Sequence, residues 1–119
     1  MDTRIAMLMR KAPYGSVYPA EGFRAMMGIA VFELDVCLIF MDAGVGVLAK
    51  GQDPSALDMK PLGEGFAALS DVGITEVYAH DESLAERGLS PSDLVLPVKV
   101  VSAGQIAEIL ERCTSVLSF

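Results

Sequence analysis

The sequence predicts an α/β fold: a three-layer α/β/α arrangement around a mainly parallel, five-stranded sheet, with residues 1–119 forming a single domain. Short apolar runs without helical periodicity alternate with stretches in which apolar residues recur at helical spacing. The runs have the length and composition of strands that are buried on both faces, as in parallel sheets. Right-handed crossovers between successive strands would place helices on both faces of such a sheet.

Two strands and a helix are expected in the first part of the chain. The apolar run 4–9 predicts the first strand, and the loop 11–19 follows it because two prolines and a glycine break regular structure there. Residues 20–33 place apolar side chains at helical spacing, which predicts the first helix. Residues 35–41 combine β-branched and aromatic side chains, which favours a central strand.

The middle of the chain is expected to add two helical segments and a third strand. Residues 45–50 leave room for one or two helical turns before Gly51, and residues 62–69 support a second main helix. Residues 74–80 predict the third strand.

A short helix and a fourth strand come next. Asp81 is the expected N-cap of a helix over 82–87, and Gly88 ends that helix where a left-handed residue is favourable. Residues 94–101 predict the fourth strand, whose Pro97 places it near an edge or an irregularity of the sheet.

The last helix has the clearest signals. Ser102 and Gln105 fit a capping box at its start. Its apolar stripe follows helical spacing and consists of Ile106, Ile109, Leu110 and Cys113. The apolar residues 115–119 predict a short final strand.

Net charge argues against nucleic acid as a partner, and the length of the apolar runs argues against a membrane span. Sixteen Asp and Glu against nine Lys and Arg give a formal net charge of -7 and a sequence pI of about 4.5, so the chain's field repels a phosphate backbone. No apolar run approaches the roughly 20 residues of a membrane helix, and the chain opens without a basic, then apolar, leader. We therefore expect no direct nucleic-acid binding, no membrane span and a cytoplasmic location.

Composition suggests an assembly. The hydrophobic share is 52%, the charged share is 21% and there are seven methionines, which indicates more apolar surface than one small domain buries. We therefore predict that the remaining apolar surface forms an interface with other protein subunits.

The two cysteines have no metal-ligand spacing and are expected to be reduced. Cys37 lies within a predicted buried strand, where the pKa of a thiol is raised. Cys113 belongs to the core stripe near a helix C-terminus, where the dipole disfavours a thiolate. Neither is expected to be a nucleophile, and the sequence predicts no metal site and no cofactor.

Residues 44–49 match the dinucleotide-binding pattern G-x-G-x-x-A after a strand. The helix that should follow is cut off by Gly51, and no acidic residue closes a second strand at the expected distance. A tight turn beside Asp42 is therefore the favoured interpretation of Gly44.

His80 is the only histidine, and it stands at the carboxyl end of the third expected strand, before a helix. Open α/β sheets place ligand-handling groups there. It is a candidate acid/base or hydrogen-bond donor, and the alternative is a hydrogen-bonded loop or interface histidine. The candidate binding or interface residues are Tyr14, Gly15, Asp42, Gly44, Tyr78, His80 and Asp81.

Several short motifs, spread in order over nearly the whole chain, resemble the DsrE/DsrF-like family, most of all its DsrF/TusC branch. The most specific pieces are the A-P-x-G loop and the S-L-x-E-R-G-L helix. The residues that carry the resemblance are Arg4-Ile5-Ala6, Ala12-Pro13-Tyr14-Gly15, Ala20-Glu21-Gly22, Asp42-Ala43-Gly44-Val45, Ser83-Leu84-Ala85-Glu86-Arg87-Gly88-Leu89 and Val116-Leu117-Ser118-Phe119.

The resemblance implies a three-layer fold and a subunit of a DsrEFH or TusBCD heterohexamer with DsrE-like and DsrH-like partners. Such complexes pass sulfane sulfur toward sulfur oxidation or tRNA 2-thiolation. In sulfur-carrying relatives a persulfide cysteine stands at the junction of the third strand and the next helix, which corresponds to His80 here. An imidazole cannot hold a transferable sulfur atom, so the resemblance implies a non-carrier subunit that supports a partner's persulfide.

Two other hypotheses remain open. One is a free-standing, homo-oligomeric DsrE-like binding module. The other is an enzyme that uses His80 with Asp42 or Asp81 as acid and base.

Overall fold

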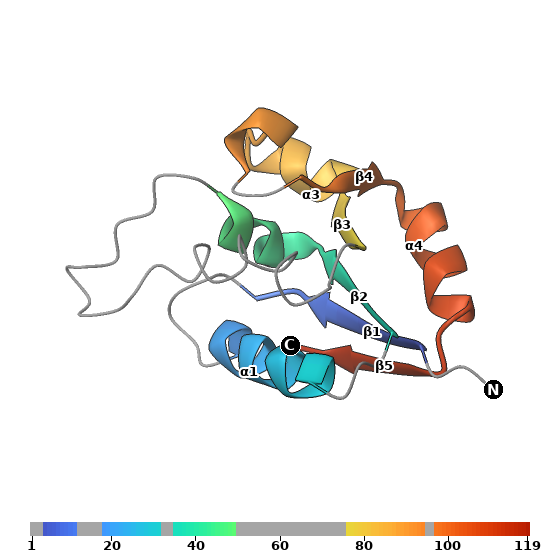
Figure 1. The fold of residues 1–119 in the computed structure, drawn as a ribbon. Helices are drawn as coiled ribbons and strands as arrows, with labels where there is room; N and C mark the ends of the chain where they lie inside the picture. The colour runs from blue at the N-terminus through green and yellow to red at the C-terminus, as the bar shows by residue number, and fades with distance from the viewer. Residues whose placement is uncertain (1–3, 12–17, 32–34, 50–75, 95–96) are drawn as a thin grey trace, which may run out of the picture.

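Five parallel strands form the centre of the computed structural model, which describes residues 4–11, 18–31, 35–49, 76–94 and 97–119 (Figure 1). The elements in chain order are β1 (Arg4–Met9), α1 (Tyr18–Val31), β2 (Asp35–Phe40), the 3-10 helix η1 (Asp42–Leu48), β3 (Val77–His80), α3 (Asp81–Glu86), the 3-10 helix η4 (Pro91–Asp93), β4 (Lys99–Val101), α4 (Ala103–Glu111) and β5 (Ser115–Ser118).

The strand order is β4-β3-β2-β1-β5, and all four pairs of neighbouring strands are parallel. Parallel neighbours need crossover connections: α1 lies in the one between β1 and β2, and α3 in the one between β3 and β4. The expected α/β fold with a five-stranded sheet is confirmed. The carboxyl ends of the strands therefore lie along one edge, and η1 and α3 begin there.

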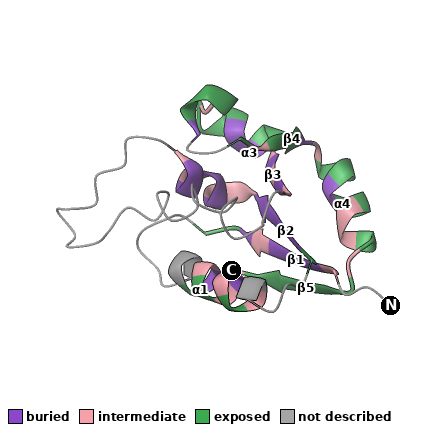
Figure 2. Cartoon of the chain, in the orientation of Figure 1, coloured by how far each residue is buried: buried purple, intermediate pink, exposed green. Residues whose placement is uncertain are grey.

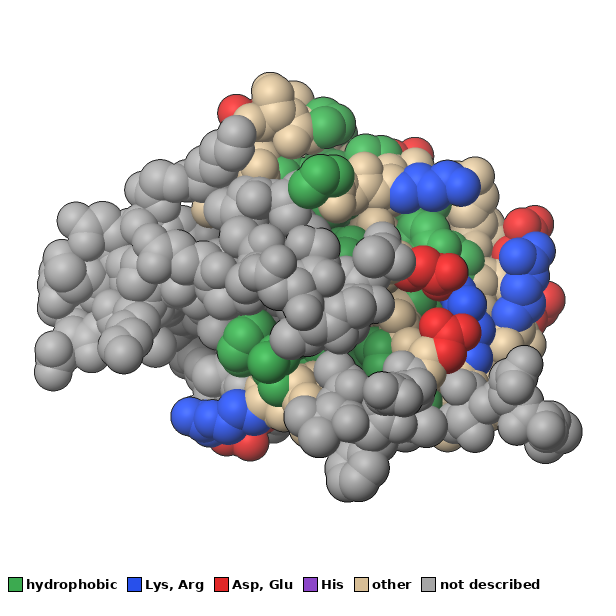
Figure 3. All heavy atoms as spheres, in the orientation of Figure 1, with side chains coloured by type: hydrophobic (Ala, Val, Ile, Leu, Met, Phe, Trp, Pro, Cys, Tyr) green, Lys and Arg blue, Asp and Glu red, His purple; other side chains and the backbone are tan. Residues whose placement is uncertain are grey.

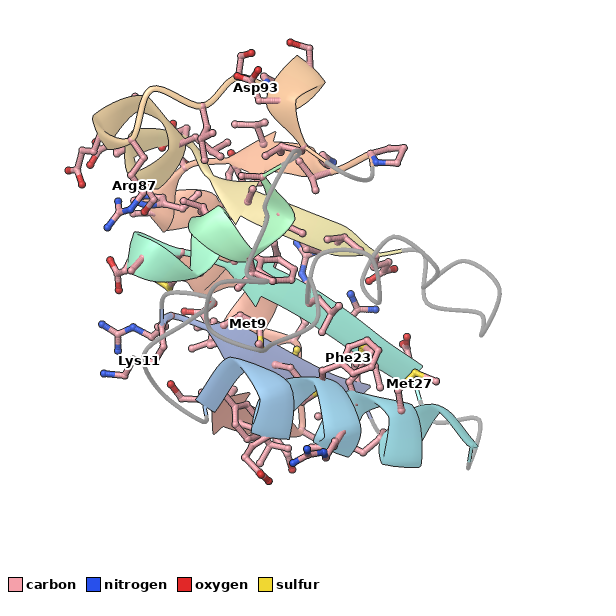
Figure 4. All side chains as sticks on the ribbon, turned by 90° about the vertical axis from the view of Figure 1, so that its left-hand side faces the viewer. Met9, Lys11, Phe23, Met27, Arg87 and Asp93 are labelled. Carbon is pink, nitrogen blue, oxygen red and sulfur yellow. The ribbon has the colours of Figure 1, made fainter. Side chains whose placement is uncertain are left out.

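Helices cover both faces of the sheet, as the three-layer prediction requires. Alternate residues of a strand point to opposite faces. In β2, Leu38 belongs to the cluster that includes Met26 of α1, whereas Ile39 packs with Ile106 of α4. Figure 4 shows Phe23 and Met27 on the side of α1 that faces the strands.

Burial is greatest in the central strands and least at one edge. Figure 2 shows β1, β2 and β3 largely buried and β5 exposed. Five of the six residues of β2 are buried, and only Asp35 is exposed. In β5 all four residues are exposed, including Val116 at 44% and Leu117 at 38%. An open edge strand with apolar side chains suits contact with another subunit.

An ion-pair cluster occupies the amino ends of the strands, opposite the edge where η1 and α3 begin. Arg4 pairs with Asp35, with Nη1 3.2 Å from Oδ2, and also with Glu76. The hydrogen bond to Glu76 is the main cause that raises the pKa of Arg4 above its usual value. Figure 3 shows acidic and basic side chains gathered at the right-hand side of the molecule.

The capping box that was predicted for the last helix is confirmed. The Gln105 main-chain N–H donates to Ser102 Oγ at 3.2 Å, and the Ser102 N–H donates to Gln105 Oε1 at 2.8 Å. Gly88 has φ 65°, as expected of a residue that ends a helix in the left-handed region. Cys113 lies two residues beyond the end of α4 rather than within it.

The predicted fourth strand over 94–101 was too long. Among the described residues of that run, the sheet includes Lys99–Val101. Ser90 and Asp93 form a reciprocal capping box that stabilises η4, and Leu94 makes one isolated antiparallel bridge to Ala49. Leu94, the first residue of the predicted strand, therefore pairs outside the sheet, directly after η4.

The predicted N-cap of α3 was wrong by one position. His80 is the N-cap, and Asp81 is the first helical residue, whose Oδ1 accepts a hydrogen bond from the Glu82 main-chain N–H at 2.6 Å. The first helix, α1, is described over Tyr18–Val31 and begins two residues earlier than predicted, while its predicted last residues lie outside the described residues. The predicted helix over 62–69 lies outside the described residues. None of the described helices has the length and apolar character required to cross a bilayer.

Candidate functional site

A hydrogen-bonded network joins the carboxyl ends of β2 and β3. His80 is the last residue of β3, and its Nδ1 lies 2.7 Å from Ser83 Oγ in the first turn of α3. The Asp42 main-chain N–H donates to the same Ser83 oxygen at 2.8 Å. Ser83 is 3% exposed, so its hydroxyl is shielded from solvent. The buried hydroxyl therefore ties His80 to the segment that follows β2.

The network fixes one side of the imidazole. Ser83 Oγ accepts from the Asp42 N–H and also forms a hydrogen bond with His80 Nδ1, whose direction depends on the tautomer of the ring. The His80 side chain is 12% exposed, and Nε2 is buried with no hydrogen-bond partner among the described residues. The nearest carboxylate oxygen recorded for it is Asp81 Oδ1 at 3.6 Å. The ring is thus held in place on one side and unpartnered on the other.

Asp42 is the strained member of the network. Its φ is 52°, in the left-handed region that few residues other than glycine adopt. The bond to Ser83 and an ion pair in which Arg10 Nε lies 2.9 Å from Asp42 Oδ2 hold it there. Strain of this kind persists only where surrounding contacts determine the conformation.

Gly44 is required by packing. A Cβ atom at Gly44 would overlap the main-chain carbonyl of Met9 in β1. Residues 42–48 form η1, and Val45, Val47 and Leu48 are fully buried. The dinucleotide pattern is therefore accounted for by a tight, buried turn beside Asp42, as the sequence favoured.

A pocket of about 490 Å³ opens beside this network at the carboxyl edge of the sheet. Figure 4 shows Lys11 and Arg87 extending from the same edge of the molecule. Arg87 is anchored because its Nη1 donates to the Ser83 carbonyl at 3.2 Å. The residues that line the pocket are Arg10, Lys11, Asp42, Ala43, Arg87 and Ser118. Three cations thus converge at one edge of a chain whose net charge is -7.

The structure brings together some predicted site residues and separates others. Asp42, His80 and Asp81 lie together at the carboxyl edge. Tyr78 lies on the α4 side and lines a different, smaller pocket of about 150 Å³, and burial raises its pKa. Tyr14 and Gly15 lie outside the described residues.

Sequence reasoning missed Ser83, Arg10 and Arg87. Ser83 follows His80 by three residues, a spacing that places two side chains on one face of a helical turn. Arg10 directly follows β1, so its position at the carboxyl edge was available from the strand prediction. Arg87 is in the S-L-x-E-R-G-L motif, but its contact with the Ser83 carbonyl depends on where the helix ends.

Neither cysteine belongs to this edge. Cys37 is fully buried, as predicted, and burial is the main cause that raises its pKa to about 12. Cys113 is partly buried, and its Sγ donates to the Ile109 carbonyl at 3.3 Å. Within the described ranges, no three His, Cys, Asp or Glu side chains come together in a way that could hold a metal ion.

Comparison with known proteins places the chain in a family. The model of the DsrE/DsrF-like family matches residues 3–119. The chain belongs to this family. It is 32% identical to the intracellular sulfur oxidation protein DsrF of Allochromatium vinosum, over 94% of this chain and 93% of that protein. It is 33% identical to a TusC homolog of Vibrio parahaemolyticus, over 98% and 99% of the two chains.

A solved structure supports the fold of this DsrE/DsrF-like chain. The crystal structure of the Escherichia coli ychN protein matches it with a TM-score of 0.86, covers 100% of both chains and is 23% identical. At that identity the likeness concerns the fold alone. The relatives DsrF and TusC agree with the branch that the sequence motifs indicated.

Removing the Ser83 hydroxyl is expected to loosen the network. Ser83→Ala leaves the Asp42 N–H and His80 Nδ1 without their shared partner, and burying an unsatisfied donor costs about 1–3 kcal/mol. Urea unfolding measures the loss. The control is Ser92→Ala, because Ser92 is exposed and should change stability by less than about 0.5 kcal/mol. Equal losses in the two variants would contradict the role of Ser83.

Proposed function

We propose that this chain is a non-carrier subunit of a DsrEFH/TusBCD-like sulfur-relay complex, in which it supports persulfide transfer by a partner subunit. The observation that carries the proposal is His80. It stands at the end of β3 and the start of α3, and its imidazole is enclosed and bonded to Ser83. The family resemblance puts the persulfide cysteine of carriers at this junction, and an imidazole offers no sulfur to load.

The state of the two thiols supports the non-carrier role. A carrier thiol has to be an accessible nucleophile with a low pKa. Cys37 is 0% exposed and its pKa is raised to about 12. Cys113 is turned toward the Ile109 carbonyl, on the α4 side of the sheet and away from the carboxyl edge.

Likeness to DsrF and TusC supports a proposal for the partners. The DsrF relative is an intracellular sulfur oxidation protein by name, and TusC homologs match at a similar identity. By analogy we propose DsrE-like and DsrH-like partners in a heterohexamer. The exposed strand β5 and its apolar side chains suit such a contact.

Loading the assembled complex with sulfur tests the proposal. The chain is purified with a DsrE-like and a DsrH-like partner, exposed to a small-molecule persulfide donor, and each subunit is weighed by intact mass spectrometry before and after reduction. We expect the added mass of a sulfur atom on the DsrE-like partner and none on this chain. A reductant-sensitive sulfur adduct on Cys37 or Cys113 would overturn the non-carrier role.

The same preparation separates the two other hypotheses. Size measurement of the chain alone and with its partners distinguishes a homo-oligomer from a heteromeric subunit. An enzyme that uses His80 as acid or base would lose its activity in His80→Ala, whereas a supporting subunit would show a change only in the partner's sulfur loading.

A further inference from the structure

The pocket at the carboxyl edge of the sheet collects positive charge from separate elements. Arg10 directly follows β1, and Arg87 is the C-cap residue of α3. Lys11, next to Arg10, lines the same pocket. Figure 4 shows Lys11 and Arg87 extending from one side of the molecule. Because the whole chain has a net charge of -7, this gathering of cations is a local feature of the fold and not a consequence of composition.

Each of the two guanidinium groups is held by a bond that leaves other donors unused. Arg10 Nε lies 2.9 Å from Asp42 Oδ2, and Arg87 Nη1 donates to the Ser83 carbonyl at 3.2 Å. A guanidinium carries five N–H donors. Within the described part of the chain, the Nη nitrogens of Arg10 form no further hydrogen bond, nor do Nε and Nη2 of Arg87. Both groups are therefore positioned, and both keep donors for an acceptor that comes from outside the chain.

Two carboxylates oppose these cations only in part. Among the described lining residues, Asp42 is the one negative side chain against three positive ones. Glu86 Oε2 lies 3.5 Å from Arg87 Nη1, but Glu86 does not line the pocket and its side chain is 72% exposed, so water screens its charge. The pocket therefore keeps a net positive charge.

The rest of the lining favours a compact, hydrophilic ligand. The volume of about 490 Å³ is within the range of ligand pockets. Ser118, at the end of β5, adds a hydroxyl, and Ala43 is the one apolar side chain among the described lining residues. Sites for bases or acyl chains are lined mainly by apolar and aromatic side chains. Guanidinium groups instead match the oxygen atoms of a sulfate or phosphate group, to which they can donate two parallel hydrogen bonds.

We propose that this pocket binds a small, doubly charged tetrahedral oxyanion, of the sulfate and phosphate class, between Arg10 and Arg87. The Asp42 carboxylate repels the anion and limits the affinity, while its ion pair with Arg10 holds that guanidinium at the edge. The site does not depend on the sulfur-relay proposal, because it needs no partner subunit and no persulfide.

Titration of the full chain with sodium sulfate tests the site. Backbone NMR signals are followed, with sodium chloride at equal ionic strength as the reference. We expect saturable shifts at Arg10, Arg87 and Ser118 with sulfate alone. Arg87→Gln should weaken sulfate binding about tenfold, the loss expected of a charge-assisted hydrogen bond. Arg24→Gln is the matched control and should bind as wild type, because Arg24 lies in α1 and pairs with Glu21.

Asp42→Asn carries the opposite expectation. The variant should bind sulfate several-fold more tightly, because it removes the repelling charge and keeps the size of the side chain. Asparagine also tolerates the left-handed conformation at this position, where φ is 52°, so the turn should persist. Circular dichroism checks that the variant is folded.

Four results would overturn the oxyanion site. The first is a set of shifts that rise linearly with sulfate and match those in sodium chloride. The second is wild-type affinity in Arg87→Gln, and the third is no gain of affinity in Asp42→Asn. The fourth is tighter binding of adenosine monophosphate than of inorganic phosphate, which would show that an organic body is recognised. None of these results would bear on the non-carrier role, which sulfur loading of the complex tests separately.

Discussion

The variant His80→Cys is expected to take up sulfur from a persulfide donor at position 80, whereas the wild-type chain takes up none. The introduced thiol would stand at the N-cap of α3, where main-chain N–H groups favour a thiolate. In the proposed function, this is the position that corresponds to the persulfide cysteine of carriers. Intact mass spectrometry and peptide mapping measure the adduct, and treatment with a reductant should remove it.

Two companion variants sharpen this result. His80→Ser has a side chain of similar size without a thiol and should stay unloaded. Adding Asp81→Asn to His80→Cys should speed loading, because the Asp81 carboxylate now lies 3.6 Å from His80 Nε2 and a nearby negative charge raises the pKa of a thiol. Equal sulfur content in His80→Ser and His80→Cys would show that the residue at this junction does not decide which subunit carries sulfur.

Replacing Gly44 with alanine is expected to destabilise the fold by about 3 kcal/mol or more. The added methyl group would overlap the Met9 carbonyl and approach the Arg10 main-chain nitrogen. Met9 lies in β1, which is paired with strands on both sides and cannot shift to make room. Urea unfolding measures the loss of stability, and circular dichroism shows whether any folded protein remains.

Gly28 supplies the matched control. It lies in α1, is exposed, and has open space where a Cβ would stand. Gly28→Ala should therefore raise stability by roughly 0.5–1 kcal/mol, because alanine restricts the unfolded chain and favours the helix. A Gly44→Ala variant as stable as Gly28→Ala would refute the close approach of η1 to β1.

The position of His80 at a strand end was predictable, but its surroundings were not. The sequence places one histidine after an apolar run and before a helix, which already indicated the carboxyl edge of a parallel sheet. The Ser83 hydroxyl that holds it also binds the Asp42 N–H, a contact between residues 41 positions apart. Only the pairing of β2 with β3 brings these residues together.

The fourth strand shows the limit of local patterns. An apolar, β-branched run over 94–101 favoured one strand, yet the reciprocal hydrogen bonds of Ser90 and Asp93 hold η4 just before it, and Leu94 pairs with Ala49 outside the sheet. The strand β4 itself spans Lys99–Val101, the last three residues of that run.

The cysteines divide in the same way. The burial of Cys37 followed from its place in an apolar strand. The place of Cys113 did not, because it lies two residues beyond α4, next to Thr114, which is hydrogen-bonded to Arg4 of β1.

By itself, the sequence determined the α/β fold class, the main strands, the capped last helix and the membership of the DsrE/DsrF-like family. These features depend on side-chain periodicity, capping residues and short motifs, which are local properties of the chain. Only the tertiary structure decided the His80–Ser83–Asp42 network and the cationic pocket at the carboxyl edge. Each of these features needs residues from separate elements. The distances between such residues are set by strand order and register, which are not encoded in any one segment.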